Sequence, residues 1–202
     1  MNAQPRSRLI LASTSRYRGG LLRRHGFEFE QDTHLVDEDA IKATISESVE
    51  LASTLSLLKA RSLADKYPGA YILAGDQIVA FEGEILGKPG SRERCIAALE
   101  AMVGKTHRLI TAITLIHPDR SEKSAITTHE MTIRQLDREE LLSIIDWDEP
   151  YDAAGGYKIE GRGLFLFERI EGEDFTAIEG LPMMKLGELM RESGFVFPSK
   201  RG

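Results

Sequence analysis

The chain has 202 residues, which is enough for one large domain or two small lobes around a substantial apolar core. Hydrophobic residues make up 42% and charged residues 29%, proportions that exclude a wholly disordered or membrane-embedded chain. The net charge of -6 provides no broad basic surface. We therefore expect no long nucleic acid as a partner. A small anionic ligand held by a few local cations is compatible with this net charge.

The single cysteine and the lack of long apolar runs indicate the cellular compartment. Cys95 cannot form an internal disulfide or a cysteine-based zinc site, which is typical of a reducing compartment. Residues 1–8 are polar, unlike a secretory signal, and no run approaches the roughly 18 apolar residues of a membrane span. We expect a cytoplasmic protein without a membrane segment.

The first third of the chain predicts a short strand and two helices. Residues 8–12 form an apolar run typical of a buried strand, and the hydroxyl residues 13–15 that follow are suited to capping a helix. Residues 48–67 carry apolar side chains at roughly helical spacing and end before Pro68. Lys59 therefore falls on a long helix.

Asp76 lies between two apolar segments, residues 71–74 and 78–81, which both predict strands. A carboxylate at such a place requires a partner, a proton or a metal. A turn at 82–84 leads from there into residues 85–89. The residues alone leave a structural hydrogen bond and a catalytic role equally open for Asp76.

The rest of the chain alternates between helices and strands. In chain order we expect a helix at 92–102, strands at 108–117 and 125–134, a helix at 138–147, a glycine-rich loop and edge at 149–163, a strand at 164–170 and a helix at 183–193. This order predicts an α/β fold with a mixed β-sheet flanked by helices. We expect residues 1–202 to form a single domain whose two lobes surround a central cleft.

Residues 13–18, Ser-Thr-Ser-Arg-Tyr-Arg, are candidates for binding phosphate. They stand at a strand-to-helix junction, where exposed N–H groups and the helix dipole attract anions. Ser13 and Ser15 can equally be helix caps. Arginines such as Arg18 are electrostatically unfavourable near a helix start without an anion, which slightly favours phosphate.

Three further segments supply charges to such a site. Lys59 and Lys88 can neutralise phosphate, although isolated lysines are usually solvated surface residues. The acidic residues 36–39 can join Asp76 in holding a hard divalent cation, or they form a solvated loop. The sequence has no Walker phosphate loop, His-Glu-x-x-His motif or nucleophile elbow, which disfavours common kinases, metalloproteases and esterases.

The chain resembles the Maf family in a set of motifs that keep the family's order. These motifs are LILASTSRYR at 9–18, VDE at 36–38, LKA at 58–60, GDQIV at 75–79, GEILGKP at 83–89, EPYDAAGGYKIEG at 149–161, FERIEG at 167–172 and GLP at 180–182. Together they cover nearly the whole chain. The resemblance implies a Maf/ITPase-like fold and metal-dependent cleavage of a nucleoside triphosphate between its α and β phosphates, which would remove modified nucleotides from the pool.

The resemblance also implies roles for single residues. The family's proton acceptor falls on Asp76, and its polar cleft positions fall on Ser13, Arg18, Glu38, Lys59 and Lys88. Glu38 and Asp76 are then the expected ligands of a divalent metal, and oxygen ligands favour Mg²⁺ or Mn²⁺ over zinc. A homodimer is a further implication of the resemblance.

Substrate selection is implied by the Asp-Gln pair at 76–77, which resembles the branch of 7-methyl-GTP pyrophosphatases. The branch that acts on dTTP and UTP has Asp-Thr instead. The first branch also has an aromatic residue at Tyr17 and a glutamate at Glu160. An aromatic face attracts the positive charge of 7-methylguanine, and Glu160 can accept from an N–H edge of the base. We therefore predict that Tyr17, Arg18, Gln77 and Glu160 determine specificity.

Other readings stay open. The branch usually has Pro-Trp where Arg16 and Tyr17 stand, so a broader range or a preference for pyrimidine triphosphates is an alternative. A protein of another class would bind nucleotide in cell division with little or no turnover. A phosphatase acting on monophosphates would release orthophosphate and no pyrophosphate.

Overall fold

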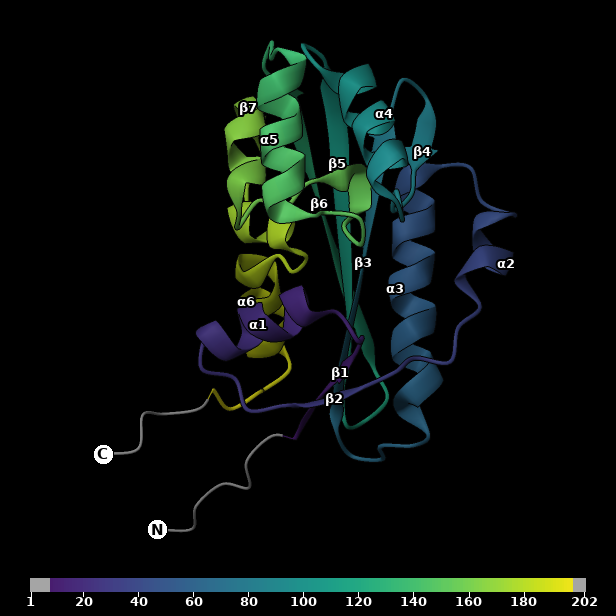
Figure 1. The fold of residues 1–202 in the computed structure, drawn as a ribbon. Coiled ribbons are helices and arrows are strands. Elements are labelled where there is room, and N and C mark those ends of the chain that lie inside the picture. Colours follow the sequence, from purple (N-terminus) through teal and green to yellow (C-terminus); the bar gives the residue numbers. More distant parts are fainter. Residues whose placement is uncertain (1–7, 198–202) are drawn as a thin grey trace.

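The computed structural model describes residues 8–197, in which one mixed sheet runs the length of the fold (Figure 1). Its strands are β1 (Leu9–Ala12), β2 (Glu30–Asp32), β3 (Tyr71–Phe81), β4 (Glu84–Leu86), β5 (Thr106–Ile116), β6 (Glu122–Ile133) and β7 (Phe167–Glu171). The order across the sheet is β2-β1-β3-β5-β6-β7, and β4 pairs with β3 beside β1. β1 runs parallel to β2 and β3, whereas all other pairs are antiparallel.

Helices cover both faces of this sheet. They are α1 (Arg16–Arg24), α2 (Glu38–Lys42), α3 (Ser48–Ala64), α4 (Arg92–Met102), α5 (Arg138–Asp148) and α6 (Met183–Glu192), with short 3-10 helices η1 (Ala154–Gly156), η2 (Arg162–Leu166) and η3 (Phe175–Glu179). α3 packs along one face of the sheet. α1 and α6 pack on the other face at one end, and α4 and α5 pack at the far end (Figure 1).

The alternation of side chains along the strands determines which helix each one meets. Ile10 and Ile72 pack against α3, while Leu11 and Leu73 point the opposite way and pack against α1 and α6. All four are at most 1% exposed, so these strands are buried on both faces. This explains why β1 and the start of β3 read as continuous apolar runs.

The predicted α/β class, mixed sheet and long helix at 48–67 are confirmed, the helix as α3. One prediction about the central strand is wrong, because residues 71–74 and 78–81 belong to the single 11-residue strand β3. Gly75 and Asp76 interrupt the apolar pattern but stay paired with Ile113 and Ala112 of β5. Pairing along a whole neighbouring strand overrides the local sequence signal.

Other boundaries also differ from the sequence prediction. The acidic residues 36–39 are not simply a loop, since Asp37 caps helix α2 by accepting from the backbone N–H of Ala40. The predicted strand at 164–170 begins only at Phe167, because residues 162–166 form η2. β2 was not predicted at all, since its three residues are polar and give no strand pattern.

No helix within residues 8–197 is long and apolar enough to cross a bilayer. Residues 1–7, which carry most of the polar segment named above, lie outside the described range. The single domain with two lobes stays a prediction.

Candidate active site

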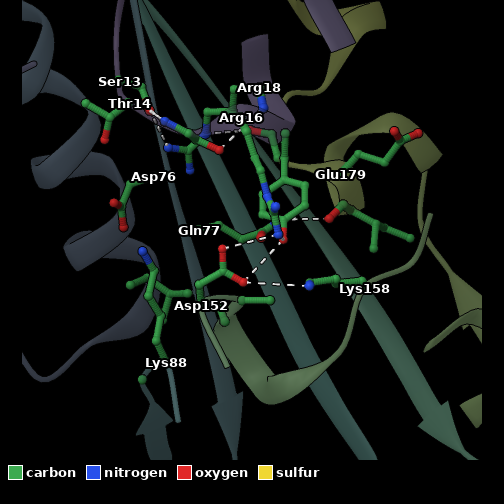
Figure 2. A pocket seen from close by; sticks show the side chains of 18 of the residues that line it. Ser13, Thr14, Arg16, Arg18, Asp76, Gln77, Lys88, Asp152, Lys158 and Glu179 are labelled. Carbon is green, nitrogen blue, oxygen red and sulfur yellow. Dashed lines mark hydrogen bonds and ion pairs between the residues drawn. The ribbon is translucent and has the colours of Figure 1, made fainter. Parts of the chain in front are cut away.

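A gap along one edge of β3 creates the cleft. β1 pairs with β3 only as far as Leu73, and β4 begins to pair with it only at Val79. Residues 74–78 therefore have no strand neighbour on this side within residues 8–197, and a cleft of about 580 Å³ opens there between α1, α3 and the segment after α5 (Figure 2). Because successive side chains of a strand point to opposite faces, Asp76 and Gln77 reach the cleft from different sides of the sheet.

Asp76 faces α3 and contacts a buried lysine. The Nζ atom of Lys59 lies 2.6 Å from Oδ1 of Asp76 and 2.7 Å from Oε1 of Glu38. Lys59 is 4% exposed and Asp76 is 6% exposed, so this charged group is largely removed from water. The charges are paired, because Lys59 contacts both carboxylates and Lys42 also contacts Glu38.

Glu38 has further contacts at the mouth of the cleft. Partial burial alone would raise its pKa, but hydrogen bonds and charge from Lys59 and Lys42 lower the pKa of Glu38 to about 2. Nε2 of His34 lies 3.2 Å from Oε1 of Glu38, and Nδ1 of His34 accepts from the N–H of Val36. Burial and the charge of Lys59 lower the pKa of His34, although the charges of Glu38 and Asp76 act in the opposite direction.

The junction between β1 and α1 brings two serines and an arginine to the cleft. Oγ of Ser15 accepts from the backbone N–H of Arg18, so Ser15 is a helix cap. Oγ of Ser13 accepts from the N–H of Ser15 at 3.2 Å and from Nη1 of Arg18 at 3.3 Å. Nε of Arg18 donates to the carbonyl of Gly180, and burial lowers the pKa of the Arg18 guanidinium. These contacts hold Arg18 beside the helix N-terminus.

Lys88 enters the cleft from the segment after β4 (Figure 2). It is exposed and, within residues 8–197, lies within ion-pair distance of no carboxylate. Lys59 is already paired with two carboxylates, whereas Lys88 is available to an incoming anion.

A clasp of polar side chains crosses the mouth of the cleft. Nη2 of Arg16 donates to the hydroxyl of Tyr17 at 2.8 Å, and this hydroxyl donates to Oδ1 of Asp152 at 3.3 Å. The Arg16 guanidinium also lies 4.9 Å from the Tyr17 ring centre, so it covers one face of the ring. Figure 2 shows Asp152 between Arg16 and Lys158, whose Nζ is 3.9 Å from Asp152.

Gln77 and Glu160 line the part of the cleft near this clasp. Partial burial raises the pKa of the Glu160 carboxyl, and repulsion from Glu179 acts in the same direction. The amide of Gln77 donates to Thr111 and to carbonyls of η3. The carboxyl group of Glu160 and the amide group of Gln77 therefore lie on the side of the cleft away from Lys59.

The donor set for a metal consists of two hard oxygen ligands. Residues 8–197 contain no group of three or more His, Cys, Asp or Glu side chains placed to hold an ion. Glu38 and Asp76 converge on Lys59, and Oδ2 of Asp76 makes no hydrogen bond with the described residues. Mg²⁺ is commonly bound by one or two carboxylates with substrate phosphates and water. The two carboxylates fit such an ion only together with oxygens of a bound polyphosphate.

Residues 8–193 match the family described as Maf-like protein. The chain belongs to the Maf family. A 7-methyl-GTP pyrophosphatase of Bdellovibrio bacteriovorus is 42% identical over 191 residues, covering 94% of this chain and 98% of that protein. A 7-methyl-GTP pyrophosphatase of Xanthomonas oryzae pv. oryzae is also 42% identical, covering 95% of this chain and 99% of that protein.

Likeness to solved structures is more distant. A HAM1 protein from Coxiella burnetii is 18% identical and reaches a TM-score of 0.44, covering 65% of this chain and 75% of that one. A nucleoside-triphosphatase / dITP/XTP pyrophosphatase from Mycobacterium abscessus is 17% identical with a TM-score of 0.40, covering 62% of this chain and 74% of that one.

In this Maf chain a single cleft brings together every site residue predicted from sequence. They are Ser13, Ser15, Tyr17, Arg18, Glu38, Lys59, Asp76, Gln77, Lys88 and Glu160. Sequence reasoning missed His34, Lys42, Asp152 and Lys158. Asp152 and Lys158 lie inside the Maf motif at 149–161, which is the signal that could have found them, whereas His34 and Lys42 lie just outside the VDE motif. The cleft position is observed, and the chemical role of each residue stays a prediction.

Proposed function

We propose that the protein hydrolyses 7-methyl-GTP to 7-methyl-GMP and pyrophosphate. The observation that carries this proposal is a cleft in which a buried carboxylate, Asp76, stands among Lys59, Arg18 and Lys88. Such a site suits a substrate with several negative charges and a reaction that transfers a proton. Relatives that are 42% identical over nearly their whole length carry the name of this activity.

Asp76 is the proposed proton acceptor. Its Oδ1 atom is held by Lys59, which leaves Oδ2 to accept a proton from water. The water oxygen forms a bond to the α-phosphorus while the bond between this phosphorus and the oxygen that bridges the α and β phosphates breaks. The proton passes to Asp76, and the bond electrons leave with pyrophosphate. The backbone of β3 fixes Asp76 between two neighbouring residues that are also paired with β5.

Cations at the other side of the reacting group stabilise the leaving pyrophosphate. Lys88 is exposed and unpaired within the described residues, and Arg18 is held by Ser13 and Gly180 beside the start of α1. A fixed guanidinium and a helix N-terminus lose little solvation or side-chain freedom when charge develops next to them. We propose that Ser13 and Ser15 line this polyphosphate site.

Glu38 and Asp76 would hold Mg²⁺ or Mn²⁺ together with phosphate oxygens. A divalent ion bound there supplies Lewis acid chemistry by withdrawing charge from the phosphoryl oxygens. The low pKa of Glu38, about 2, keeps this carboxylate charged throughout the neutral range. The metal requirement is tested by chelator treatment, after which turnover should return on addition of either ion.

The clasp side of the cleft is the proposed base site. One face of the Tyr17 ring is covered by Arg16, so the base would use the other face. The positive ring of 7-methylguanine gains about 0.5–2 kcal/mol from such a contact. Glu160 and Gln77 add hydrogen-bonding groups to this end of the cleft. A neutral base could also stack on Tyr17, so the experiment that follows compares nucleotides with different bases.

The deciding experiment measures pyrophosphate release by the purified protein with Mg²⁺ or Mn²⁺. The substrates are 7-methyl-GTP, GTP, UTP, dTTP and CTP at equal concentrations. We expect 7-methyl-GTP to be hydrolysed best. A preference for a pyrimidine would replace the base assignment, release of orthophosphate would replace the reaction, and binding without turnover would favour the nucleotide-binding protein.

An Asp76→Asn variant tests the proton acceptor in the same assay. We expect its kcat to fall by roughly 10²–10⁴-fold, the usual contribution of a positioned general base. Asp146→Asn is the control, because Asp146 is an exposed aspartate that pairs with Arg92 and does not line the cleft. Its kcat should stay within a few-fold of the wild-type value. Full turnover by a folded Asp76→Asn protein would remove Asp76 from this role.

A further inference from the structure

The side-chain amide of Gln77 has only one orientation that satisfies its surroundings. Its Nε2 atom lies 2.9 Å from the carbonyl of Ala177, 3.2 Å from the carbonyl of Ile178 and 3.1 Å from Oγ1 of Thr111. Backbone carbonyls can only accept, so the atom facing them must be the NH₂ group. The amide oxygen Oε1 is then directed away from η3, and it makes no hydrogen bond with residues 8–197.

Thr111 takes part in fixing this orientation although it does not line the cleft. It is fully buried on β5, directly opposite Gln77 in the register of β3 and β5. Its hydroxyl donates to the carbonyl of Ala177 at 3.1 Å. The single proton of the hydroxyl is thereby used, so Oγ1 can only accept from Gln77. Thr111 thus links the amide to the same carbonyl that the amide itself binds.

The carbonyls of η3 are themselves held in place. Asp174 is 1% exposed, and its Oδ1 atom accepts from the N–H and the hydroxyl of Thr176. Its Oδ2 atom accepts from the N–H of Met184 at the start of α6. One buried carboxylate therefore joins η3 to α6. Gln77 and Thr111 bind to a rigid segment, so the amide cannot turn without losing several buried hydrogen bonds.

We infer that Thr111 is a positioning residue for base selection, which holds Gln77 so that the acceptor Oε1 and no donor faces the base. This inference rests on the proposed function and deepens it. The N1–H and N2–H₂ groups of a guanine edge can both donate to such an acceptor, whereas adenine has an acceptor at N1 and no amino group at C2, so neither donor is present at these positions. A site built to hydrogen-bond one edge rejects analogues that lack the matching group.

The test compares kcat/KM for 7-methyl-GTP and for ATP in Thr111→Val. This change keeps the shape of the side chain and removes the hydroxyl. We expect kcat/KM for 7-methyl-GTP to fall about tenfold, mostly through KM, with little change for ATP, since one hydrogen bond is worth about that factor. Thr111→Ser retains a hydroxyl and should restore most of the preference. Thr111→Cys, nearly isosteric with a weak donor, replaces Thr111→Val if that variant does not fold.

Thr114→Val is the matched control. Thr114 is also fully buried on β5, but its hydroxyl bonds to Ser56 and Ser124 on the side of α3. It should lower stability without changing the ratio of kcat/KM for the two substrates. Equal fold losses for both substrates in Thr111→Val, or no loss for either, would leave the ratio of kcat/KM unchanged and overturn the inference.

Binding of the products separates this inference from the proposed function. If the wild-type protein hydrolyses no nucleotide, the proposed function fails, and calorimetric titration with 7-methyl-GMP and AMP then decides the inference. A preference for 7-methyl-GMP that Thr111→Val reduces about tenfold would support it. A preference that the variant leaves unchanged, or no preference in the wild-type protein, would overturn it.

Discussion

Lys59 is the residue on which the charged part of the cleft depends. It is 4% exposed and lies within 2.7 Å of oxygens of both Glu38 and Asp76. Two carboxylates that converge in this way would repel each other without the ammonium group. The ion pair therefore allows the two carboxylates to lie close together, as the proposed reaction and metal site require.

Removal of this charge should weaken the whole protein. We expect Lys59→Met to lower the free energy of unfolding by about 3–5 kcal/mol, because it leaves a buried carboxylate uncompensated. Lys42→Met removes the other lysine on Glu38, which is largely exposed, and should cost at most about 1 kcal/mol. Urea denaturation at neutral pH measures both values. Equal costs for the two variants would contradict the burial argument.

Tyr17 allows a second test at the same scale. Tyr17→Phe keeps the aromatic face and loses the hydroxyl bond to Asp152, whereas Tyr17→Leu loses the ring as well. We expect Tyr17→Leu to lower kcat/KM for 7-methyl-GTP by up to about 30-fold relative to Tyr17→Phe, the factor that corresponds to about 2 kcal/mol. GTP, whose base carries no charge, is the comparison substrate. A similar loss for GTP would argue against attraction between the ring and a cationic base.

At the scale of elements, the cleft depends on short irregular segments attached to a rigid sheet. η3 and the turn after it provide backbone carbonyls that hold Gln77 and Arg18. Gly180 in that turn has φ of 113° and would place a Cβ 3.2 Å from Cγ of Arg18. A side chain at this position would be strained and would crowd Arg18, so glycine suits both the turn and the close approach.

The cap formed by Asp174 should determine how firmly η3 is held. Asp174→Ala removes three hydrogen bonds, including one to the start of α6, and should cost about 2–3 kcal/mol, from the lost cap and the unsatisfied N–H groups. We expect faster hydrogen exchange in residues 175–184 with little change in α3. Exchange that rises equally in α3 would mean that the loss is global and that η3 has no separate role.

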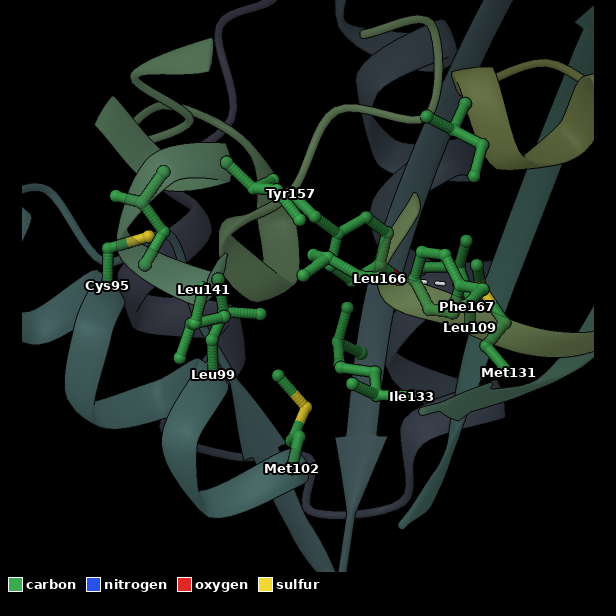
Figure 3. Close-up of a cluster of buried hydrophobic side chains, with 14 of the residues drawn as sticks. Cys95, Leu99, Met102, Leu109, Met131, Ile133, Leu141, Tyr157, Leu166 and Phe167 are labelled. Carbon is green, nitrogen blue, oxygen red and sulfur yellow. Dashed lines mark hydrogen bonds between the residues drawn. The ribbon is translucent and has the colours of Figure 1, made fainter. Parts of the chain in front are cut away.

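At the scale of the whole molecule, buried histidines couple stability to pH. His107 is 2% exposed, and its Nε2 atom bonds to the hydroxyl of Tyr157 within the apolar cluster shown in Figure 3. Burial lowers the pKa of His107 to about 4 from its ordinary 6.5. Burial also lowers the pKa of His117 and of His129. These three side chains are neutral in the folded protein near neutral pH.

The unfolding free energy should therefore fall as the pH falls. Below pH 6.5 the unfolded chain binds a proton at His107 that the folded protein does not, until about pH 4 is reached. The contribution is fully present above pH 6.5, and its loss amounts to at most about 3 kcal/mol. Urea denaturation between these limits should give a steeper decline for the wild-type protein than for His107→Gln. The same slope in both proteins would contradict this origin.

Assembly stays a prediction at this scale. The homodimer implied by the resemblance to Maf proteins is tested by light scattering of the purified protein, with one copy or two as the distinguishable masses. The single domain over residues 1–202 is tested by whether chemical unfolding follows one transition at every probe.

Local residue order determined much of the fold class. Apolar runs at β1 and β3, hydroxyl or acidic residues at helix starts and glycine or proline after helices act through neighbouring backbone, so they can be read directly. The Maf motifs also identified the ten candidate residues that lie in one cleft. Matching a motif identifies the residues of a site even when their arrangement in space is not known. Short polar elements such as β2 and α2 lack an apolar pattern and were not predicted.

Only the tertiary structure decided how those residues meet. The burial of Lys59 between Glu38 and Asp76 and the contact of Thr111 with η3 join residues 17 to 66 positions apart in the chain. No local preference encodes such contacts, because they arise when strands and helices pack and exclude water from the polar groups between them. Sequence therefore determined the types of groups in the cleft, and packing decided their partners, their orientation and their charge.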